Sequence, residues 1–237
     1  MRSRRFAIAL SALAVLTICG APAIAGSITG TVKYEGAVPN LRPVPMDADP
    51  GCAKKHSGPV PAEMLLLGSG NTLGNIFVHV KNAPDKKYPV PSEPVVLNQE
   101  GCQYVPHVLG LMVGQTFKIL NSDGLLHNVH SLPKVNTAFN RAMPGNVKEA
   151  EFTFTKPEPI FKIKCDVHPW MGAFVGVMTH PYFDVTAADG KFKIDGLPAG
   201  TYDVEVWHEK LKTQTSKVTV GDGDTKSLDF TFKAPAR

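Results

Sequence analysis

Residues 165–171 read CDVHPWM, and this heptapeptide decides what the rest of the chain has to build. It carries the thiol of Cys165, the imidazole of His168 and the thioether of Met171 at C-x2-H-x2-M spacing. Earlier in the chain, residues 121–128 (NSDGLLHN) offer a second imidazole, that of His127. A site made from two segments so far apart in sequence needs two loops that a rigid scaffold holds together.

The types of donor atom in these two segments favour one metal. Two histidines, one cysteine and a weak axial methionine form the ligand set of a blue-copper site. A structural zinc site is closed by further Cys or His residues, and a catalytic zinc site leaves one position open to water. The soft pair of Cys165 and Met171 therefore predicts a copper ion that cycles between two oxidation states. The alternatives are zinc in the same site, or plain packing of a buried thiol and a gap-filling methionine.

The first 25 residues have the three parts of a secretory signal peptide. Basic residues at positions 2, 4 and 5 precede an apolar stretch over residues 6–18, and residues 23–25 (AIA) form a cleavage site. The mature chain is therefore expected to begin at Gly26 and to be periplasmic or secreted. The apolar stretch is too short for a membrane span, and no later segment suits one.

Charge and cysteine count narrow the function further. The leader holds three of the 25 basic residues, so the mature chain has 22 against 21 acidic ones, a formal charge of +1 that gives no reason to expect nucleic acid as a partner. Removing the leader also removes Cys19 and leaves Cys52, Cys102 and Cys165, an odd number for an oxidising compartment. Cys165 belongs to the metal motif, so a disulfide is predicted between Cys52 and Cys102.

The mature sequence has the pattern of an all-β protein. Short apolar or alternating runs are separated by Gly and Pro, and no stretch has a convincing helical period apart from a single turn within residues 60–67. Residues 35–70 are rich in proline and irregular. The strands expected from the pattern are 27–34, 75–81, 94–97, 115–120, 152–154, 160–165, 172–179, 191–194, 202–207, 216–220 and 227–232.

The two metal motifs resemble those of the cupredoxins, the blue type 1 copper proteins, of the amicyanin and plastocyanin type. The heptapeptide is similar to their short ligand loop, and residues 126–130 (LHNVH) are similar to the segment around their first ligand. The resemblance covers about residues 75–179 and implies a Greek-key β-sandwich with one type 1 copper, bound by His127, Cys165, His168 and Met171. It also implies that Asn128 ties the two ligand loops together.

Two positions depart from the cupredoxin pattern. Asp166 stands where a hydroxyl residue usually follows the cysteine, and Val167 stands where a proline usually precedes the second histidine. We expect the carboxylate of Asp166 to lower the reduction potential and to take the place of the hydroxyl that Asn128 would contact.

The last part of the chain resembles a different family. Residues 189–192 (DGKF) and 196–204 (GLPAGTYDV) are similar to carboxypeptidase-regulatory-like and transthyretin-like modules, which are small β-sandwiches with structural or recognition roles. Residues 30–36 have a similar pattern and are expected to add a strand to this module. The predicted order is a signal peptide (1–25), an N-terminal strand with a Pro-rich excursion (26–74), a cupredoxin-like copper domain (75–179) and a small Ig/transthyretin-like β-sandwich (180–237) packed against it.

The remaining histidines offer competing ligands. His130 is the alternative to His127, but positions three apart on a strand point to opposite faces, so the two cannot easily reach one metal. The predicted disulfide would bring His56 and His107 towards each other, which leaves a second metal site open. No third or fourth ligand for such a site is evident.

Three classes of function follow from these motifs. The first is an electron carrier, with His168 as the electron port and a redox protein partner, such as a c-type cytochrome or a dehydrogenase, docking at the Pro169 and Trp170 surface. The second is a copper-binding accessory protein in which the C-terminal sandwich does the recognition. An enzyme is not expected, because the sequence has no H-x-H pair and a centre closed by four protein ligands has no open position for substrate.

Overall fold

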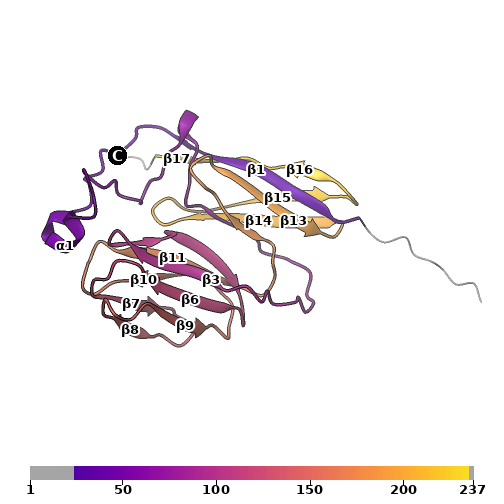
Figure 1. Ribbon diagram of the computed structural model, residues 1–237. Coiled ribbons are helices and arrows are strands. Elements are labelled where there is room, and N and C mark those ends of the chain that lie inside the picture. Colours follow the sequence, from indigo (N-terminus) through magenta and orange to yellow (C-terminus); the bar gives the residue numbers. More distant parts are fainter. Residues whose placement is uncertain (1–23, 235–237) are drawn as a thin grey trace, which may run out of the picture.

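Two β-sandwiches lie one above the other in the computed structural model, which describes residues 24–234 (Figure 1). The fold is all-β, as predicted, with short helical turns confined to the segment between the first two strands. The predicted signal peptide falls almost entirely on residues 1–23, outside the described residues. Within residues 24–234, no helix has the length and apolar character needed to cross a membrane.

The first sandwich is built from the middle of the chain. One sheet has the strand order β5-β11-β10-β7-β8 and the other has the order β4-β3-β6-β9, with parallel pairs at β5–β11 and β3–β6. Its strands are β3 (Val95–Glu100), β4 (Gln103–Val105), β5 (Val108–Met112), β6 (Thr116–Asn121), β7 (His127–Leu132), β8 (Asn140–Met143), β9 (Glu149–Thr153), β10 (Glu158–Lys164) and β11 (Gly172–Met178).

Alternation of side chains along these strands creates the core of the first sandwich. In β6, Phe117 and Ile119 are fully buried while their neighbours are only half-buried, the period-two pattern of a strand with one inward face. Phe154 and Phe161 meet edge to face inside the sandwich, with their ring centroids 5.1 Å apart. The ligand loops leave this core at one end of the sandwich, so tightly packed strands hold them on both sides.

The second sandwich is built from both ends of the chain. One sheet centres on β1 (Gly26–Glu35), which pairs with β13 (Lys191–Leu197), β16 (Thr225–Ser227) and β17 (Phe230–Lys233). The other has the order β12-β2-β14-β15, from β12 (Phe183–Val185), β2 (Phe77–Val80), β14 (Gly200–His208) and β15 (Lys212–Val220). The expected contribution of residues 30–36 to this module is confirmed, because they fall largely within β1.

The predicted domain boundary at residue 75 differs from the structure. The sequence pattern assigns β2 to the copper domain, but the strand pairs with β12 and β14 of the second sandwich. Its four residues are all buried, because one face packs in the second sandwich and the other faces the first. Burial on both faces explains the difference, since the apolar pattern of β2 indicates a strand without saying which sheet it joins.

The segment between β1 and β2 wraps around one end of the first sandwich. Its helical turns are at Met46–Ala48, at α1 (Pro50–Ala53) and at Ser69–Asn71, so the turn expected within residues 60–67 is wrong. Asp49 caps α1, accepting hydrogen bonds from the N–H groups of Gly51 and Cys52, and Pro50 occupies the first helical position. The predicted disulfide between Cys52 and Cys102 is confirmed, and it fastens α1 to the first sandwich.

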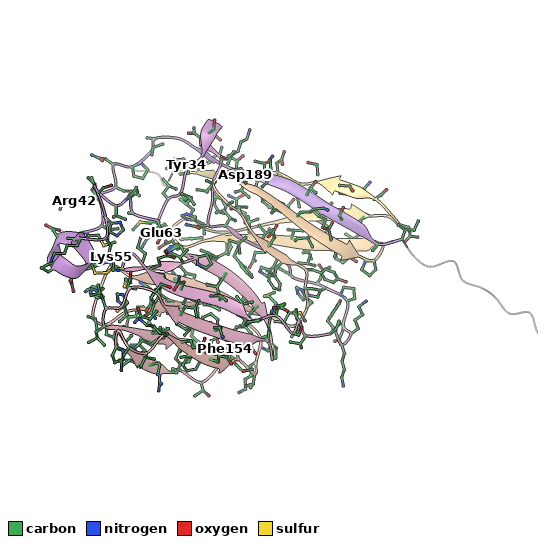
Figure 2. The ribbon with its side chains drawn as sticks, in the orientation of Figure 1. Tyr34, Arg42, Lys55, Glu63, Phe154 and Asp189 are labelled. Atoms are coloured by element: carbon green, nitrogen blue, oxygen red, sulfur yellow. A yellow bond between two sulfur atoms is a disulfide. The ribbon has the colours of Figure 1, made fainter. Side chains whose placement is uncertain are left out.

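The two sandwiches pack directly on each other, as expected from the lack of a flexible linker. Phe77 of β2 projects onto β5 and β11, where a Cβ at Gly110 or Gly176 would lie only 2.7 or 2.5 Å from its ring. Phe77, Val108 and Met178 form a buried cluster between the sandwiches. Glu63, from the wrapping segment, lies between the two bodies (Figure 2).

Candidate metal centre

The loop 165–171 joins β10 to β11 and is closed by its own hydrogen bonds. The N–H of Cys165 donates to the carbonyl oxygen of Met171 (3.2 Å), and the N–H of Met171 donates to that of His168 (2.9 Å). The N–H of His168 points at the Cys165 sulfur at 3.3 Å. The heptapeptide is therefore a tight turn that aims the thiol and the second imidazole at the same point.

The structure brings the thiol and two imidazoles of the sequence motifs together. His127 is the first residue of β7, and its Nδ1 lies 2.9 Å from Nδ1 of His168. The Cys165 sulfur lies 3.9 Å from Nδ1 of His168, and one ligand atom from each of the three residues falls within 4.8 Å of the others. All three residues are buried, and the Met171 side chain is buried in the same hydrophobic cluster.

Each imidazole is held from behind by a carboxylate. Nε2 of His127 lies 2.9 Å from Oδ2 of Asp123, and Nε2 of His168 lies 3.1 Å from Oδ2 of Asp49. Both Nε2 atoms therefore carry a proton, and both Nδ1 atoms lie on the side of the Cys165 sulfur. This orientation suits metal binding, because metal-bound histidines usually donate the other ring N–H to a carboxylate or carbonyl.

Asp123 is anchored by four donors, one of which is His127. Its oxygens also accept hydrogen bonds from the backbone N–H groups of Gly101 (2.7 Å) and Cys102 (2.8 Å). Nζ of Lys55 lies 3.1 Å from Oδ1 of Asp123. Burial alone would raise the pKa of this carboxyl, but His127 and the other donors hold it well below its usual range. Asp123 is therefore a fixed negative charge behind His127.

The same network prepares the thiol to become a thiolate. Burial would raise the pKa of Cys165, but His127 and the backbone N–H groups of the loop lower it to about 7. Burial would lower the pKa of His127, but Asp123 and Cys165 raise it to about 9. A proton is thus held between a thiolate and an imidazole, which is a position that a metal cation can take instead.

Asn128 and Asp166 connect the two ligand loops, as the resemblance implied. Oδ1 of Asn128 accepts the N–H of Asp166 (2.6 Å) and lies 3.4 Å from the Cys165 sulfur, while its Nδ2 donates to Oδ2 of Asp166 (3.1 Å). The Asp166 carboxylate thus stands in the expected place of a hydroxyl. Its pKa is lowered by Lys164 first, and then by Asn140 and Asn128.

His130 lies outside the cluster. Its Nδ1 is 3.0 Å from Oδ2 of Asp166, on the outer side of the ligand loops. The preference for His127 over His130 therefore agrees with the geometry, and the reason is the strand alternation of β7.

The His168 edge differs from the expectation of an open electron port. His168 is only 2% exposed, since Asp49 covers its Nε2 and the disulfide sulfurs lie within 4.8 Å of its ring nitrogen. Trp170 contacts the His168 ring at 5.1 Å between centroids, is half-buried, and donates its indole N–H to the carbonyl oxygen of Cys102 (3.1 Å). The exposed apolar side chains beside the centre are Leu126, Val167 and Pro169.

His56 and His107 have separate surroundings. Nε2 of His56 lies 2.8 Å from the carbonyl oxygen of Gly101, whereas His107 lies between the sandwiches, 2.7 Å from Glu209. Across residues 24–234, neither takes part in a cluster of three metal-binding side chains. The second metal site that the sequence left open has no geometric support.

Asp49, Lys55 and Asp123 are the site residues that sequence reasoning missed. Asp49 and His168 are 119 residues apart, and no pattern in the chain indicates their contact. One local signal was present, because Asp49 followed by Pro50 is typical of a helix N-cap and would have placed a turn there. Asp123 lies within the quoted motif 121–128, four residues before His127.

Comparisons with known proteins give similarities to both sandwiches. The family model of the carboxypeptidase regulatory-like domain matches residues 169–233, mostly within the second sandwich. No curated protein is similar enough to count as a relative.

Among solved structures, a methionine-to-alanine mutant of amicyanin with Cu(I) is 23% identical with a TM-score of 0.33, covering 42% of this chain and 97% of its own. The amicyanin of Paracoccus versutus is also 23% identical with a TM-score of 0.32, covering 42% of this chain and 96% of its own. A copper-containing nitrite reductase from Thermus scotoductus is 26% identical with a TM-score of 0.31, covering 40% of this chain but only 24% of its own. These partial similarities leave the chemistry of the centre to be argued from its own residues.

Proposed function

We propose that this protein binds one copper ion as a type 1 centre and carries single electrons between redox partners. The observation that carries the proposal is the convergence of His127 Nδ1, His168 Nδ1 and the Cys165 sulfur in a buried site. Met171, whose carbonyl oxygen accepts the N–H of Cys165 and whose side chain is buried in the same cluster as that thiol, would be the weak axial ligand. When bound, copper would supply a one-electron couple between its two oxidation states.

The protein's own part in this function is to hold the donor atoms still. The carboxylates of Asp49 and Asp123 fix the ring orientations of the two histidines, and Asn128 ties the His127 strand to the Cys165 loop. Burial excludes water, so the ligand set needs little rearrangement when the charge changes. Four protein ligands would leave no open position for a substrate, so we assign no enzymatic turnover to the chain.

The surface formed by Leu126, Val167 and Pro169 is our choice for the docking site of the partner. These side chains are exposed and apolar beside the two ligand loops. Trp170 would carry the electron outward, because it contacts His168 and is itself half-buried. We propose a redox protein such as a c-type cytochrome or a dehydrogenase as the partner. The disulfide, which persists in oxidising compartments, supports a periplasmic or secreted location.

The alternative is a copper-binding accessory protein, in which the ion is cargo or structural and the second sandwich recognises the partner. One observation favours it. Asp49 and the disulfide cover the His168 edge that a simple carrier would leave open. A reversible one-electron couple would support the carrier, whereas release of copper on reduction would support the accessory role.

The first test is to load the mature protein with Cu(II) and record its visible and electron paramagnetic resonance spectra. We expect an intense thiolate-to-copper band with a narrow hyperfine splitting, which Cys165→Ser abolishes because it removes the thiolate. The matched control is His130→Ala, which removes a neighbouring imidazole outside the cluster and should leave both spectra unchanged. A colourless protein, or a spectrum that Cys165→Ser does not alter, would rule the type 1 centre out.

A further inference from the structure

Three loops meet at the end of the first sandwich that lies opposite the metal centre. They are the β2–β3 segment (81–94), the β7–β8 loop (133–139) and the β9–β10 loop (154–157). β10 starts at this end, runs antiparallel to β7 and β11, and ends at the ligand loop 165–171. Since β10 has seven residues, about 20 Å of strand separates the three loops from the metal ligands, and α1 lies at the far end with the centre (Figure 1).

Two of these loops are bound together by the carboxylate of Glu158, which is only 4% exposed. Its oxygens accept the backbone N–H groups of three consecutive residues, Lys134 (2.6 Å), Val135 (3.1 Å) and Asn136 (3.1 Å). The Asn136 side chain in turn donates to the carbonyl oxygen of Lys156 (2.9 Å) and accepts the N–H of that residue (3.0 Å). Glu158 thus directs its charge inward to the backbone, while the side chains of Lys134 and Lys156 stay exposed.

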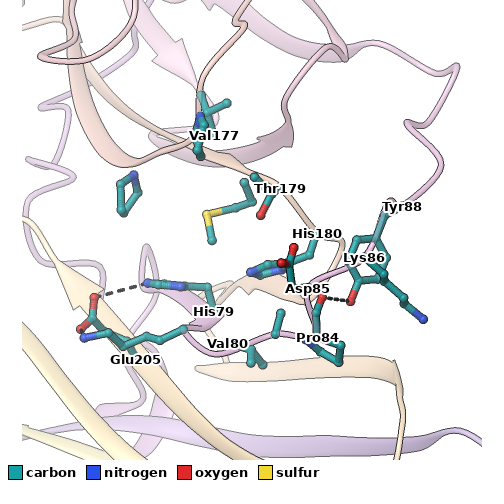
Figure 3. A pocket seen from close by; sticks show the side chains of 15 residues that line it. His79, Val80, Pro84, Asp85, Lys86, Tyr88, Val177, Thr179, His180 and Glu205 are labelled. Carbon is teal, nitrogen blue, oxygen red and sulfur yellow. Dashed lines mark hydrogen bonds and ion pairs between the residues drawn. The ribbon is translucent and has the colours of Figure 1, made fainter.

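The β2–β3 segment lies beside these two loops. It lines a cavity of about 450 Å³ together with Pro157, the neighbour of Lys156 in the β9–β10 loop. Figure 3 shows Lys86 at the rim of this cavity, with its side chain extending away from it, and Nζ of Lys86 lies 5.1 Å from the centroid of the Tyr88 ring. Lys87, the next residue, is also exposed. The three loops therefore present their lysines on one end of the molecule.

Positive charge exceeds negative charge on these loops. They hold five lysines against two carboxylates, those of Asp85 and Glu93. Lys81 pairs with Glu205 of β14 at 2.9 Å. The other four lysines are exposed, and no carboxylate within residues 24–234 forms an ion pair with them: Lys86, Lys87, Lys134 and Lys156. Four ammonium groups without a counter-ion on the protein indicate an anionic partner.

Apolar side chains are exposed next to these lysines. Val135, which follows Lys134, is 50% exposed, and Val90 and Leu132 are 46% and 40% exposed. Loop tips that combine lysines with aliphatic side chains suit a bilayer surface, where the ammonium groups meet lipid phosphates and the aliphatic groups enter the acyl boundary. The aliphatic side chains stand singly on separate loops, so they fit a broad fluid surface better than the fixed side chains of a protein partner.

We propose that the loops 81–94, 133–139 and 154–157 bind the surface of a bilayer that contains anionic phospholipids. The four unpaired lysines contact lipid phosphates, and Val90 and Val135 enter the boundary between headgroups and acyl chains. Each lysine near such a surface contributes about fivefold in affinity, so the binding is peripheral and reversible. Bound in this way, the protein holds its metal centre on the side away from the membrane. The inference is independent of copper, because it uses none of the residues of the metal centre.

The test is flotation of the full mature protein with vesicles of phosphatidylcholine, either alone or mixed with phosphatidylglycerol. We expect binding to the mixed vesicles only, and weaker binding as salt screens the lysines. Combining Lys86→Ala, Lys134→Ala and Lys156→Ala should weaken binding about a hundredfold. The matched control removes the same charge from three exposed lysines of the second sandwich and should leave binding nearly unchanged: Lys33→Ala, Lys191→Ala and Lys212→Ala.

Two further measurements separate a bilayer from other anionic partners. Val135→Ser keeps the charge and should weaken vesicle binding about threefold, whereas Val38→Ser, at an exposed valine outside these loops, should not. In NMR spectra of the wild type, the mixed vesicles should broaden the amide signals of residues 134–136 and leave those of 165–171 sharp.

Equal binding to both kinds of vesicle, or full binding by the triple lysine variant, would overturn the proposal. So would broadening at 165–171 in place of 134–136, a result that does not depend on how any variant folds. Binding of soluble polyglutamate as tight as that of the mixed vesicles, with no effect of Val135→Ser, would also overturn it, because the loops would then be a site for an acidic protein.

Discussion

At the scale of single residues, the carboxylates of Asp49 and Asp123 set the environment of the proposed centre. Each accepts a hydrogen bond from the distal nitrogen of a ligand histidine, at 3.1 and 2.9 Å. A carboxylate in this position stabilises positive charge on the ligand set, which is greater in the oxidised than in the reduced state. Both side chains should therefore favour Cu(II) over Cu(I).

Asp49→Asn tests this effect without removing the cap of α1, because asparagine caps helices as well as aspartate does. We expect the reduction potential to rise, because the charge-assisted hydrogen bond between residue 49 and His168 becomes a neutral one. Redox titration of the copper band measures the change. Asp47→Asn, an exposed position two residues earlier, is the control and should leave the potential unchanged. An unchanged potential in Asp49→Asn would mean that this carboxylate has no influence on the centre.

The ligand cluster could be predicted from sequence at this scale because its chemistry is local. Cys165, His168 and Met171 share one loop, and their spacing and donor types are readable without a structure. The role of Asp49 could not be predicted in the same way. Its contact with His168 spans 119 residues and depends on how the segment between β1 and β2 packs. A motif shows which atoms can bind a metal, but the carboxylates behind them follow from tertiary structure.

At the scale of elements, α1 and the disulfide act together as a cover over His168. The cap residue of α1 is the one that reaches His168, and Cys52 within α1 is bonded to Cys102, whose N–H binds Asp123. Lys55, just after α1, adds an ion pair to Asp123. One short segment therefore contributes to the surroundings of both ligand histidines.

Replacing both disulfide cysteines by alanine should weaken this cover and the whole fold. The Cys52–Cys102 bond spans 50 residues, so its loss should reduce the free energy of unfolding by about 4 kcal/mol in the loop-entropy model. Denaturant unfolding measures that loss. In the metal-free protein, we also expect the buried thiol of Cys165 to react faster with a thiol reagent, because α1 is no longer held over the site.

The thiol reaction needs its own control. Adding Cys165→Ser to the double variant should abolish the reaction, which identifies the thiol that reacts. If the double variant is less stable but its Cys165 reacts no faster than in the wild type, then the disulfide stabilises the fold without covering the centre.

At the scale of the whole molecule, His107 joins the two sandwiches. Its Nδ1 lies 2.9 Å from the carbonyl oxygen of Gly172 in the first sandwich, and its Nε2 lies 2.7 Å from Glu209 in the second. Glu63 of the wrapping segment lies 3.6 Å from Nδ1. Since both nitrogens face acceptors, the doubly protonated ring suits the site. Burial would lower the pKa of His107, but Glu209 and Glu63 raise it overall.

This contact predicts a pH dependence of stability. Because the pKa of His107 is raised on folding, its stabilising effect is complete below the pKa of an unfolded histidine and is lost as pH rises through the folded pKa. The free energy of unfolding of the wild type should therefore exceed that of Glu209→Gln most at mildly acidic pH, and the difference should shrink as pH rises. Denaturant unfolding across pH measures it. Glu149→Gln, at an exposed carboxylate, is the control, and a difference that grows with pH would contradict the assignment.

At this scale the sequence predicted two β-sandwiches packed together but not which strands form each. β2 was assigned to the wrong sandwich, because a short, mostly apolar run identifies a buried strand and carries no information on its partners. The C-terminal module was easier to predict from the sequence. The turns around Gly190 and Gly196 need a positive φ, and the glycines indicate these turns in the sequence. The sequence therefore predicted turns, which depend on local backbone conformation, but not the pairing of strands that are far apart in the chain.

The pairing of β1 and β2 with C-terminal strands makes the first sandwich an insertion within the second. Val80, at the end of β2, donates its N–H to the carbonyl oxygen of Tyr182 (3.0 Å), so the points where the chain leaves and re-enters the second sandwich are neighbours. Such closely spaced entry and exit points make the metal-binding body a cassette, which the Cys52–Cys102 disulfide also ties to its host. The cover over His168 comes from the host, however, between β1 and β2. A transplanted cassette would therefore arrive with its histidine edge bare, and the host determines how enclosed the centre is.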